Sequence, residues 1–188
     1  MAAKPRREPR VLAQLSPLDR LGALARKSGN LPPLGRAASA LGHLGRGGLI
    51  WHATAPIVAA RSQQSTPRGT LLSSIAIGTA FALSTTLAKA IERPRPCQQG
   101  ERPLIPCPDG GSLPSDQAAA AFAAASMFAW LQPRLRRPLA IAATAMATAR
   151  VTCGVHYPSD VIAGALIGTA TACITQALAE RRASDDAG

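Results

Sequence analysis

The chain has 188 residues, of which 47% are hydrophobic and only 3% aromatic, and its formal net charge at pH 7 is +11. This length predicts a single folded domain. Much of the apolar content is alanine and glycine, which suits closely packed membrane helices better than a water-soluble core. The basic residues cluster at the N-terminus and between apolar segments, with no nucleic-acid recognition motif, so the composition argues against nucleic-acid binding.

Residues 1–45 are predicted to be a basic N-terminal tail followed by an amphipathic helix. The run Ser-Pro-Leu-Asp at residues 16–19 is typical of a helix start. Apolar residues then recur at helical spacing as far as Gly29. This helix either lies on the membrane surface or caps the helix bundle, and both alternatives stay open. Residues 30–48 are rich in glycine and proline and are expected to be loop and short helix.

Residues 46–180 are predicted to form an all-α integral membrane bundle of about five to six helices. The clearest spanning helix is residues 70–88, which carry no charge, since a transmembrane helix needs about 20 apolar residues. Gly164 and Gly168 in the last helix favour close packing against a neighbour. Residues 181–188 are expected to be a polar tail. The five apolar segments are 49–60, 70–88, 117–131, 138–149 and 161–179.

Three polar segments, residues 89–96, 112–117 and 149–160, lie at the junctions between these helices and their loops. Two crossings separate the second segment from the third, and the first shares a loop with the second, so all three are expected on one membrane face. Cations and a helix N-terminus together favour phosphate binding. The polar residues gathered there are Lys89, Arg93, Arg95, Ser115, Arg150, His156 and Asp160.

The third segment indicates phosphoryl-transfer chemistry. Asp160 follows His156 by four positions, in the first turn of the last helix. A carboxylate there can hold one imidazole nitrogen and leave the other free as a base or nucleophile. Arg150 is a permanent cation whose forked guanidinium suits phosphate oxygens.

The order and spacing of the three segments resemble the type 2 phosphatidic acid phosphatase superfamily, which also includes vanadium haloperoxidases. The likeness covers about residues 45–180, and its third motif is matched by Arg150, His156 and Asp160. It implies a phosphatase of lipid phosphates that needs no metal or other cofactor. His156 would attack phosphorus and Asp160 would orient it. The residues that would hold the phosphoryl oxygens are Lys89, Arg95, Ser115 and Arg150.

The sequence departs from the family pattern at three positions. Five residues, not six, separate Lys89 from Arg95, which rotates a helical side chain by about 100°. Lys89 is therefore either a phosphate ligand or a residue at the membrane edge. Ala149 replaces a serine. Gln117 replaces the histidine that protonates the leaving group, and glutamine cannot be a general acid. Asp116 is a possible substitute.

The sequence therefore predicts a membrane phosphatase that hydrolyses a lipid phosphate or diphosphate, with a polyprenyl lipid as the favoured substrate. The alternative is a lipid-phosphate-binding protein whose catalysis is impaired by the change at Gln117. A haloperoxidase is rejected because the chain is small and membrane-like. The chain offers no cluster of carboxylates, histidines or cysteines at metal-ligand spacing. Expected partners are the lipid substrate and the membrane, and a homo-oligomer stays open.

The protein is predicted to reside in the cell membrane, but the sequence leaves open which face carries the site. The family likeness favours the outer face, which would place the basic turn at residues 134–137 in the cytoplasm. Five crossings would then put the basic N-terminus outside, against the rule that positively charged segments prefer the cytoplasmic side. If the loop faces outside, Cys97 and Cys107 are expected to form a disulfide.

Overall fold

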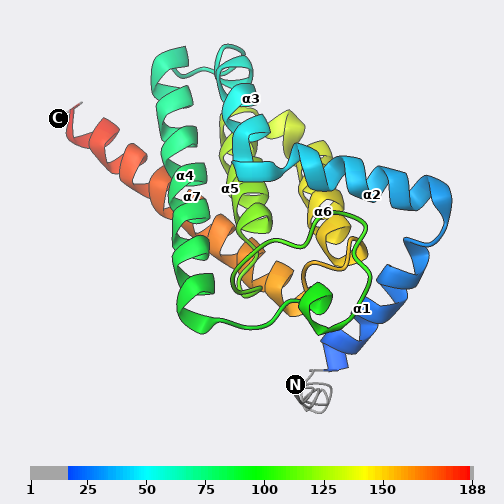
Figure 1. The fold of residues 1–188 in the computed structure, drawn as a ribbon. Helices are drawn as coiled ribbons and strands as arrows, with labels where there is room; N and C mark the ends of the chain where they lie inside the picture. The colour runs from blue at the N-terminus through cyan, green and yellow to red at the C-terminus, as the bar shows by residue number, and fades with distance from the viewer. Residues whose placement is uncertain (1–16, 187–188) are drawn as a thin grey trace, which may run out of the picture.

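The computed structural model describes residues 17–186, and this part of the chain is helical with no β-strand (Figure 1). The predicted all-α membrane bundle is confirmed. The basic tail expected before Pro17 lies outside the described residues. The helices are α1 (Pro17–Ser28), α2 (Pro32–Leu44), α3 (Leu49–Ala59), α4 (Thr66–Ile91), α5 (Asp116–Leu131), α6 (Arg136–Thr152) and α7 (Pro158–Asp185).

Helix α5 is the centre of the bundle and contacts α3, α4, α6 and α7 (Figure 1). Its sequence is apolar around the whole circumference, which is typical of a helix that is buried on all sides. Most of its alanines are fully buried, together with Met127 and Phe128. The small alanine side chains therefore allow four helices to pack closely against α5.

Helix α7 packs against α5 with almost no side chain between them. A Cβ added at Gly164 would lie 2.3 Å from the backbone oxygen of Ser115, and one at Gly168 would lie 2.1 Å from that of Ala119. The predicted close-packing face is confirmed. This contact also joins the two helix starts, because the Ser115 backbone N–H donates to the Asp160 backbone oxygen at 2.9 Å.

Two segments are long and apolar enough to cross a membrane by length and composition, Thr66–Gln99 and Pro158–Asp185. Large apolar side chains point outward along both, as Leu71 on α4 and Leu166 on α7 show with exposures of 61% and 67%. Outward-facing apolar side chains along a helix of this length suit a surface that is solvated by lipid. Helix α7 extends through residues 181–185, which were predicted to be tail, because good helix formers such as arginine and alanine continue it.

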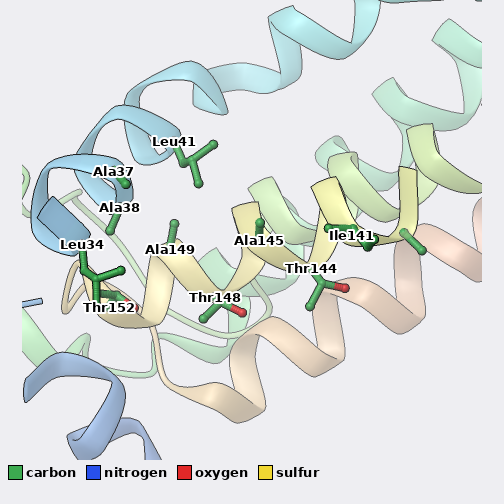
Figure 2. A pocket seen from close by; sticks show the side chains of 11 residues that line it. Leu34, Ala37, Ala38, Leu41, Ile141, Thr144, Ala145, Thr148, Ala149 and Thr152 are labelled. Atoms are coloured by element: carbon green, nitrogen blue, oxygen red, sulfur yellow. The ribbon is translucent and has the colours of Figure 1, made fainter. Parts of the chain in front are cut away.

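The N-terminal helices lie beside the bundle. Helix α1 packs on the start of α7, where a Cβ at Gly22 would lie 2.8 Å from the Pro158 side chain. This position is the one expected of a helix that caps the bundle. Helix α2 occupies a region where loop and a short helix were expected. It borders an apolar groove of about 620 Å³ against α6, with Leu34 and Leu41 on one wall and Ile141 on the other (Figure 2).

Candidate active site

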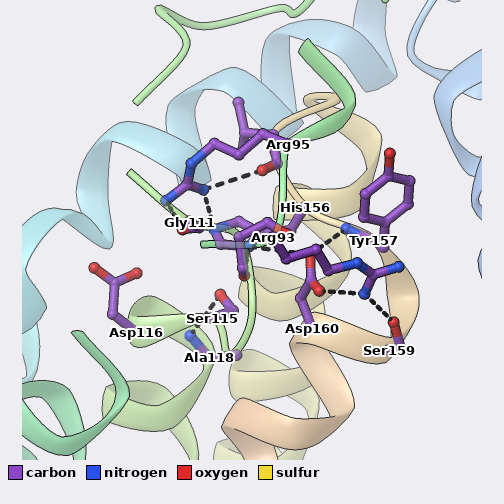
Figure 3. A network of polar contacts seen from close by, with 12 residues as sticks. Arg93, Arg95, Gly111, Ser115, Asp116, Ala118, His156, Tyr157, Ser159 and Asp160 are labelled. Atoms are coloured by element: carbon purple, nitrogen blue, oxygen red, sulfur yellow. Dashed lines mark hydrogen bonds and ion pairs between the residues drawn. The ribbon is translucent and has the colours of Figure 1, made fainter. Parts of the chain in front are cut away.

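His156 lies at the end of the bundle where the loop between α4 and α5 meets the starts of α5 and α7 (Figure 3). Its side chain is 1% exposed. Nε2 is 2.9 Å from Nη1 of Arg95, and Nδ1 is 2.8 Å from the backbone oxygen of Ser112. A guanidinium can only donate, so Nε2 must accept and Nδ1 must carry the proton that is donated to Ser112. These partners select the neutral tautomer with a lone pair on Nε2.

Electrostatics favour the same neutral form. Burial lowers the pKa of His156 below its usual value, because removal from water disfavours the imidazolium cation. The charges of Arg150 and Arg95 lower it further, whereas Asp160 opposes them. At neutral pH, His156 therefore presents an unprotonated nitrogen beside two permanent cations.

Arg95 is held in place by backbone oxygens on three sides. Its Nε donates to Gly110 at 3.2 Å, Nη2 to Gly111 at 2.8 Å and Nη1 to Val155 at 3.1 Å. Only 6% of the residue is exposed. Because these contacts fix the plane of the guanidinium, it is positioned to meet an anion at the Nε2 side of His156.

Asp160 is fully buried and organises the entry into α7. Its Oδ1 accepts from Arg93 at 2.7 Å, and its Oδ2 accepts from the Tyr157 backbone N–H at 2.8 Å. The same Oδ2 lies 3.6 Å from Nδ1 of His156. The carboxylate is therefore at ion-pair distance from the imidazole, while the Ser112 oxygen is the shorter hydrogen-bond partner of that nitrogen.

Arg150 is the third cation of the site and comes from the last turn of α6. It is 3% exposed, and its Nη1 is 3.5 Å from the Gly42 backbone oxygen. Within residues 17–186, its Nε has no hydrogen-bond partner. A buried guanidinium with an unpaired donor can bind an anion without first breaking a strong contact.

Comparison with known proteins decides the family. The family model described as PAP2 superfamily matches residues 69–183, which is more than half of the chain. The chain belongs to the PAP2 superfamily. Among curated proteins, no significant match was found.

Two solved structures share the fold. One is a transmembrane PAP2 type phosphatidylglycerolphosphate phosphatase from Bacillus subtilis, with a TM-score of 0.70 and 21% identity over 90% of this chain and 90% of that one. The other is Aquifex aeolicus LpxE, with a TM-score of 0.72 and 24% identity over 88% of this chain and 98% of that one. The membrane bundle of this PAP2 protein is thus a fold known from experiment.

The second polar segment of this PAP2 protein starts α5 and is mostly engaged within the protein. The Ser115 hydroxyl oxygen accepts from the Ala118 backbone N–H at 3.4 Å, and Asp116 Oδ1 accepts from the Gln117 backbone N–H at 2.7 Å. These bonds occupy two of the amides that a helix start would otherwise offer to phosphate. Ser115 can still donate through its hydroxyl hydrogen.

Gln117, at the position of the family's acid, is 6% exposed. Its Oε1 is buried without a hydrogen-bond partner in the described part of the chain. A Cβ added at Gly45 would lie 2.8 Å from this oxygen, so the turn before α3 covers the glutamine. The side chain is thus enclosed at the start of α5, with its Oε1 unpaired within residues 17–186.

Lys89 lies apart from the hydrogen-bonded cluster around His156. It is exposed in the last turn of α4, and it forms no hydrogen bond or ion pair with residues 17–186. The one-residue departure from the family spacing agrees with this placement. Its role as a phosphate ligand remains a prediction.

The loop that carries Arg95 is closed by the predicted disulfide. Cys97 and Cys107 are bonded, with their Cα atoms 6.0 Å apart. The pairing is confirmed. Among the described residues, no three histidine, cysteine or acidic side chains form a group that could hold a metal ion.

Sequence reasoning missed several contributors to the site. The backbone oxygens that hold Arg95 and His156 carry no side-chain signal. Asp19 was interpreted only as part of a helix start, yet it is 2% exposed and reaches the site from α1. The ion pair between Asp19 and Arg93 could not be predicted from motif spacing, because 73 residues lie between them in the sequence.

Proposed function

We propose that this PAP2 protein is a membrane phosphatase that hydrolyses a lipid phosphate or diphosphate through a phosphohistidine on His156. The observation that carries the proposal is the buried, neutral imidazole whose Nε2 lone pair faces Arg95 at 2.9 Å. A nucleophile with an available lone pair beside a fixed cation is what attack on a phosphate requires.

The reaction has two steps. Nε2 gives up its hydrogen bond from Arg95 and attacks phosphorus, and the N–P bond forms as the bond from phosphorus to the lipid oxygen breaks. The lipid oxygen leaves with the electron pair of that bond and takes up a proton from water. Water then attacks the phosphohistidine, the N–P bond breaks, and inorganic phosphate leaves. Throughout, Nδ1 stays protonated and its N–H donates a hydrogen bond to the Ser112 backbone oxygen. Asp160 stabilises the positive charge of the ring. Arg95 and Arg150 stabilise the negative oxygens, as oriented charges do in a water-poor site.

A lipid substrate fits the surroundings of the site. The bundle presents apolar side chains outward, and the groove between α2 and α6 offers further apolar surface, from Ile141 to Thr152 along α6. Thr152 lies two positions beyond the site cation Arg150. The solved relative from Bacillus subtilis is named for a lipid phosphate substrate. A polyprenyl lipid is our favoured substrate, and a site that binds such lipids without turnover is the alternative.

The outer face of the cell membrane is our proposed location for the site. The disulfide between Cys97 and Cys107 lies in the loop that carries Arg95, and disulfides persist in oxidising compartments. The basic turn at residues 134–137 lies at the other end of α5 and α6 and would face the cytoplasm, as positive loops prefer.

A panel of lipid substrates tests the proposal. Purified protein in detergent is assayed for phosphate release from polyprenyl and glycerolipid phosphates and diphosphates. We expect turnover by the wild type, loss of turnover in His156→Ala, and retained turnover in the control His43→Ala, since His43 is exposed at the end of α2. Phosphate release by His156→Ala at the wild-type rate would refute the proposal. A single burst without turnover in the wild type would favour the impaired alternative.

A further inference from the structure

Helix α1 contributes a buried carboxylate to the active-site cluster although it lies outside the segment matched by the family, residues 69–183. Asp19 is 2% exposed. Its Oδ2 accepts from Nη2 of Arg93 at 2.8 Å, and its Oδ1 accepts from the Ser159 backbone N–H at 3.0 Å. One carboxylate thus holds both a site arginine and the first turn of α7.

Arg93 links Asp19 to Asp160, the carboxylate that faces His156. Its Nη1 donates to Asp160 Oδ1 and to the Ser159 hydroxyl, both at 2.7 Å, and its guanidinium carbon lies 4.3 Å from the centre of the Tyr157 ring (Figure 3). A continuous chain of charged contacts therefore runs from Asp19 through Arg93 to Asp160, which faces His156.

We infer that Asp19 is a positioning residue, through which α1 sets the geometry and the net charge around Asp160 and His156. The inference rests on the proposed function of His156. The charge of one guanidinium is shared here between two carboxylates, so the cluster of Asp19, Arg93 and Asp160 has a net charge of −1. This negative charge favours the positive ring that exists while phosphorus is bonded to Nε2.

Neutralising Asp19 changes this balance without touching the reacting atoms. Arg93 would then pair with Asp160 alone, the cluster would become neutral, and the imidazole would face an uncompensated excess of positive charge from Arg95 and Arg150. The turn at Ser159 would also lose a charged partner at a helix start, where negative charge is favourable. The expected result is a slower chemical step rather than weaker lipid binding.

The chain offers a matched control for the docking of α1. Arg26 on the same helix pairs with Glu101 in the loop that carries Arg95, and Glu101 is 39% exposed. Glu101→Gln removes an ion pair of α1 without changing the charge next to Asp160. A role of α1 in docking alone predicts equal losses from Asp19→Asn and Glu101→Gln, whereas a role through Asp160 predicts a loss only from Asp19→Asn.

Two measurements on detergent-purified protein test the inference. In Asp19→Asn we expect kcat on the best substrate of the wild type to fall about tenfold, with KM unchanged, and Asp19→Glu to recover part of the loss. Glu101→Gln should keep wild-type kcat. Thermal unfolding of each variant controls for loss of the fold.

The second measurement needs no turnover and so separates this inference from the proposed function. The chain has three histidines, so NMR titration of labelled imidazoles can follow His156, assigned with His156→Ala. We expect Asp19→Asn to lower the pKa of His156 and Glu101→Gln to leave it unchanged. An unchanged His156 pKa in folded Asp19→Asn, or an equal shift in both variants, would overturn the inference even if the wild type proves inactive as a phosphatase.

Discussion

Gln117→His restores a group that can give a proton to the leaving oxygen, and its effect should depend on the substrate. A lipid monoester leaves as an alkoxide, which needs a proton in the transition state. A lipid diphosphate leaves as a phosphate monoester, which is far less basic. General acid catalysis contributes roughly 10²-fold to 10⁴-fold, so we expect monoester hydrolysis to rise about 10²-fold and diphosphate hydrolysis to change little.

The structure supports the lower end of this range. Gln117 is 6% exposed beside the site, so a histidine there would be enclosed, and burial limits the fraction that carries a proton at neutral pH. A factor of 10² corresponds to about 2.7 kcal/mol of transition-state stabilisation. Asp116 offers little competition, because its Oδ1 is already engaged in accepting the Gln117 backbone N–H at 2.7 Å.

The assay is initial-rate phosphate release from matched lipid monophosphates and diphosphates in the same detergent. Gln132→His is the control, because Gln132 caps the far end of the same helix, α5, and should change neither rate. The reasoning is refuted if Gln117→His leaves both rates unchanged. It is also refuted if the wild type already hydrolyses simple alkyl phosphates as fast as diphosphates.

Three further predictions follow from the site and its loop. Because burial lowers the pKa of His156, protonation should silence the nucleophile only at acidic pH, so kcat/KM should stay level from pH 7 down to about 6.5, the usual histidine pKa. A rate that halves near pH 7 or above would contradict this. Since Arg95 and Arg150 are proposed to neutralise the phosphate, activity should survive EDTA, and vanadate should inhibit as a mimic of the five-coordinate phosphorus. Loss in EDTA with recovery in magnesium would refute this account. If the loop faces outside, Cys97 and Cys107 should resist thiol labelling in intact cells until a reductant is added. Labelling only after permeabilisation, without reductant, would place the loop in the cytoplasm.

The bundle could be predicted from the sequence because its signals are local. An uncharged run of helical length predicted α4, and the spacing of Gly164 and Gly168 predicted that the last helix packs closely against a neighbour, which the structure shows to be α5. The full length of helix α2 was not predicted, because glycine and proline lower helix propensity. Proline is nevertheless compatible with this helix, since Pro32 lies in the first turn, where proline is tolerated. Packing against α6 supplies what local propensity lacks.

The site was predictable only as far as motif spacing reaches. Arg95, Arg150, His156 and Asp160 were expected together, and the structure brings Arg95 and Asp160 to the His156 imidazole, while Arg150 contacts the Gly42 backbone oxygen. Spacing could not reveal that Arg93 bridges two carboxylates, because Asp19 comes from a helix far away in the sequence. Nor could it reveal that a backbone oxygen, that of Ser112, is the closest partner of His156 Nδ1, since every residue has such an oxygen.

The central claim is that His156 becomes covalently phosphorylated, and trapping that intermediate tests it most directly. Purified protein is mixed briefly with a lipid substrate labelled in the transferred phosphorus, quenched in alkali, where phosphohistidine survives better than in acid, and mapped by mass spectrometry of peptides. We predict one labelled peptide with phosphate on His156, and none in His156→Ala. Label on any other residue, or steady turnover by the wild type with no phosphorylated protein under conditions that trap the intermediate, would contradict the account.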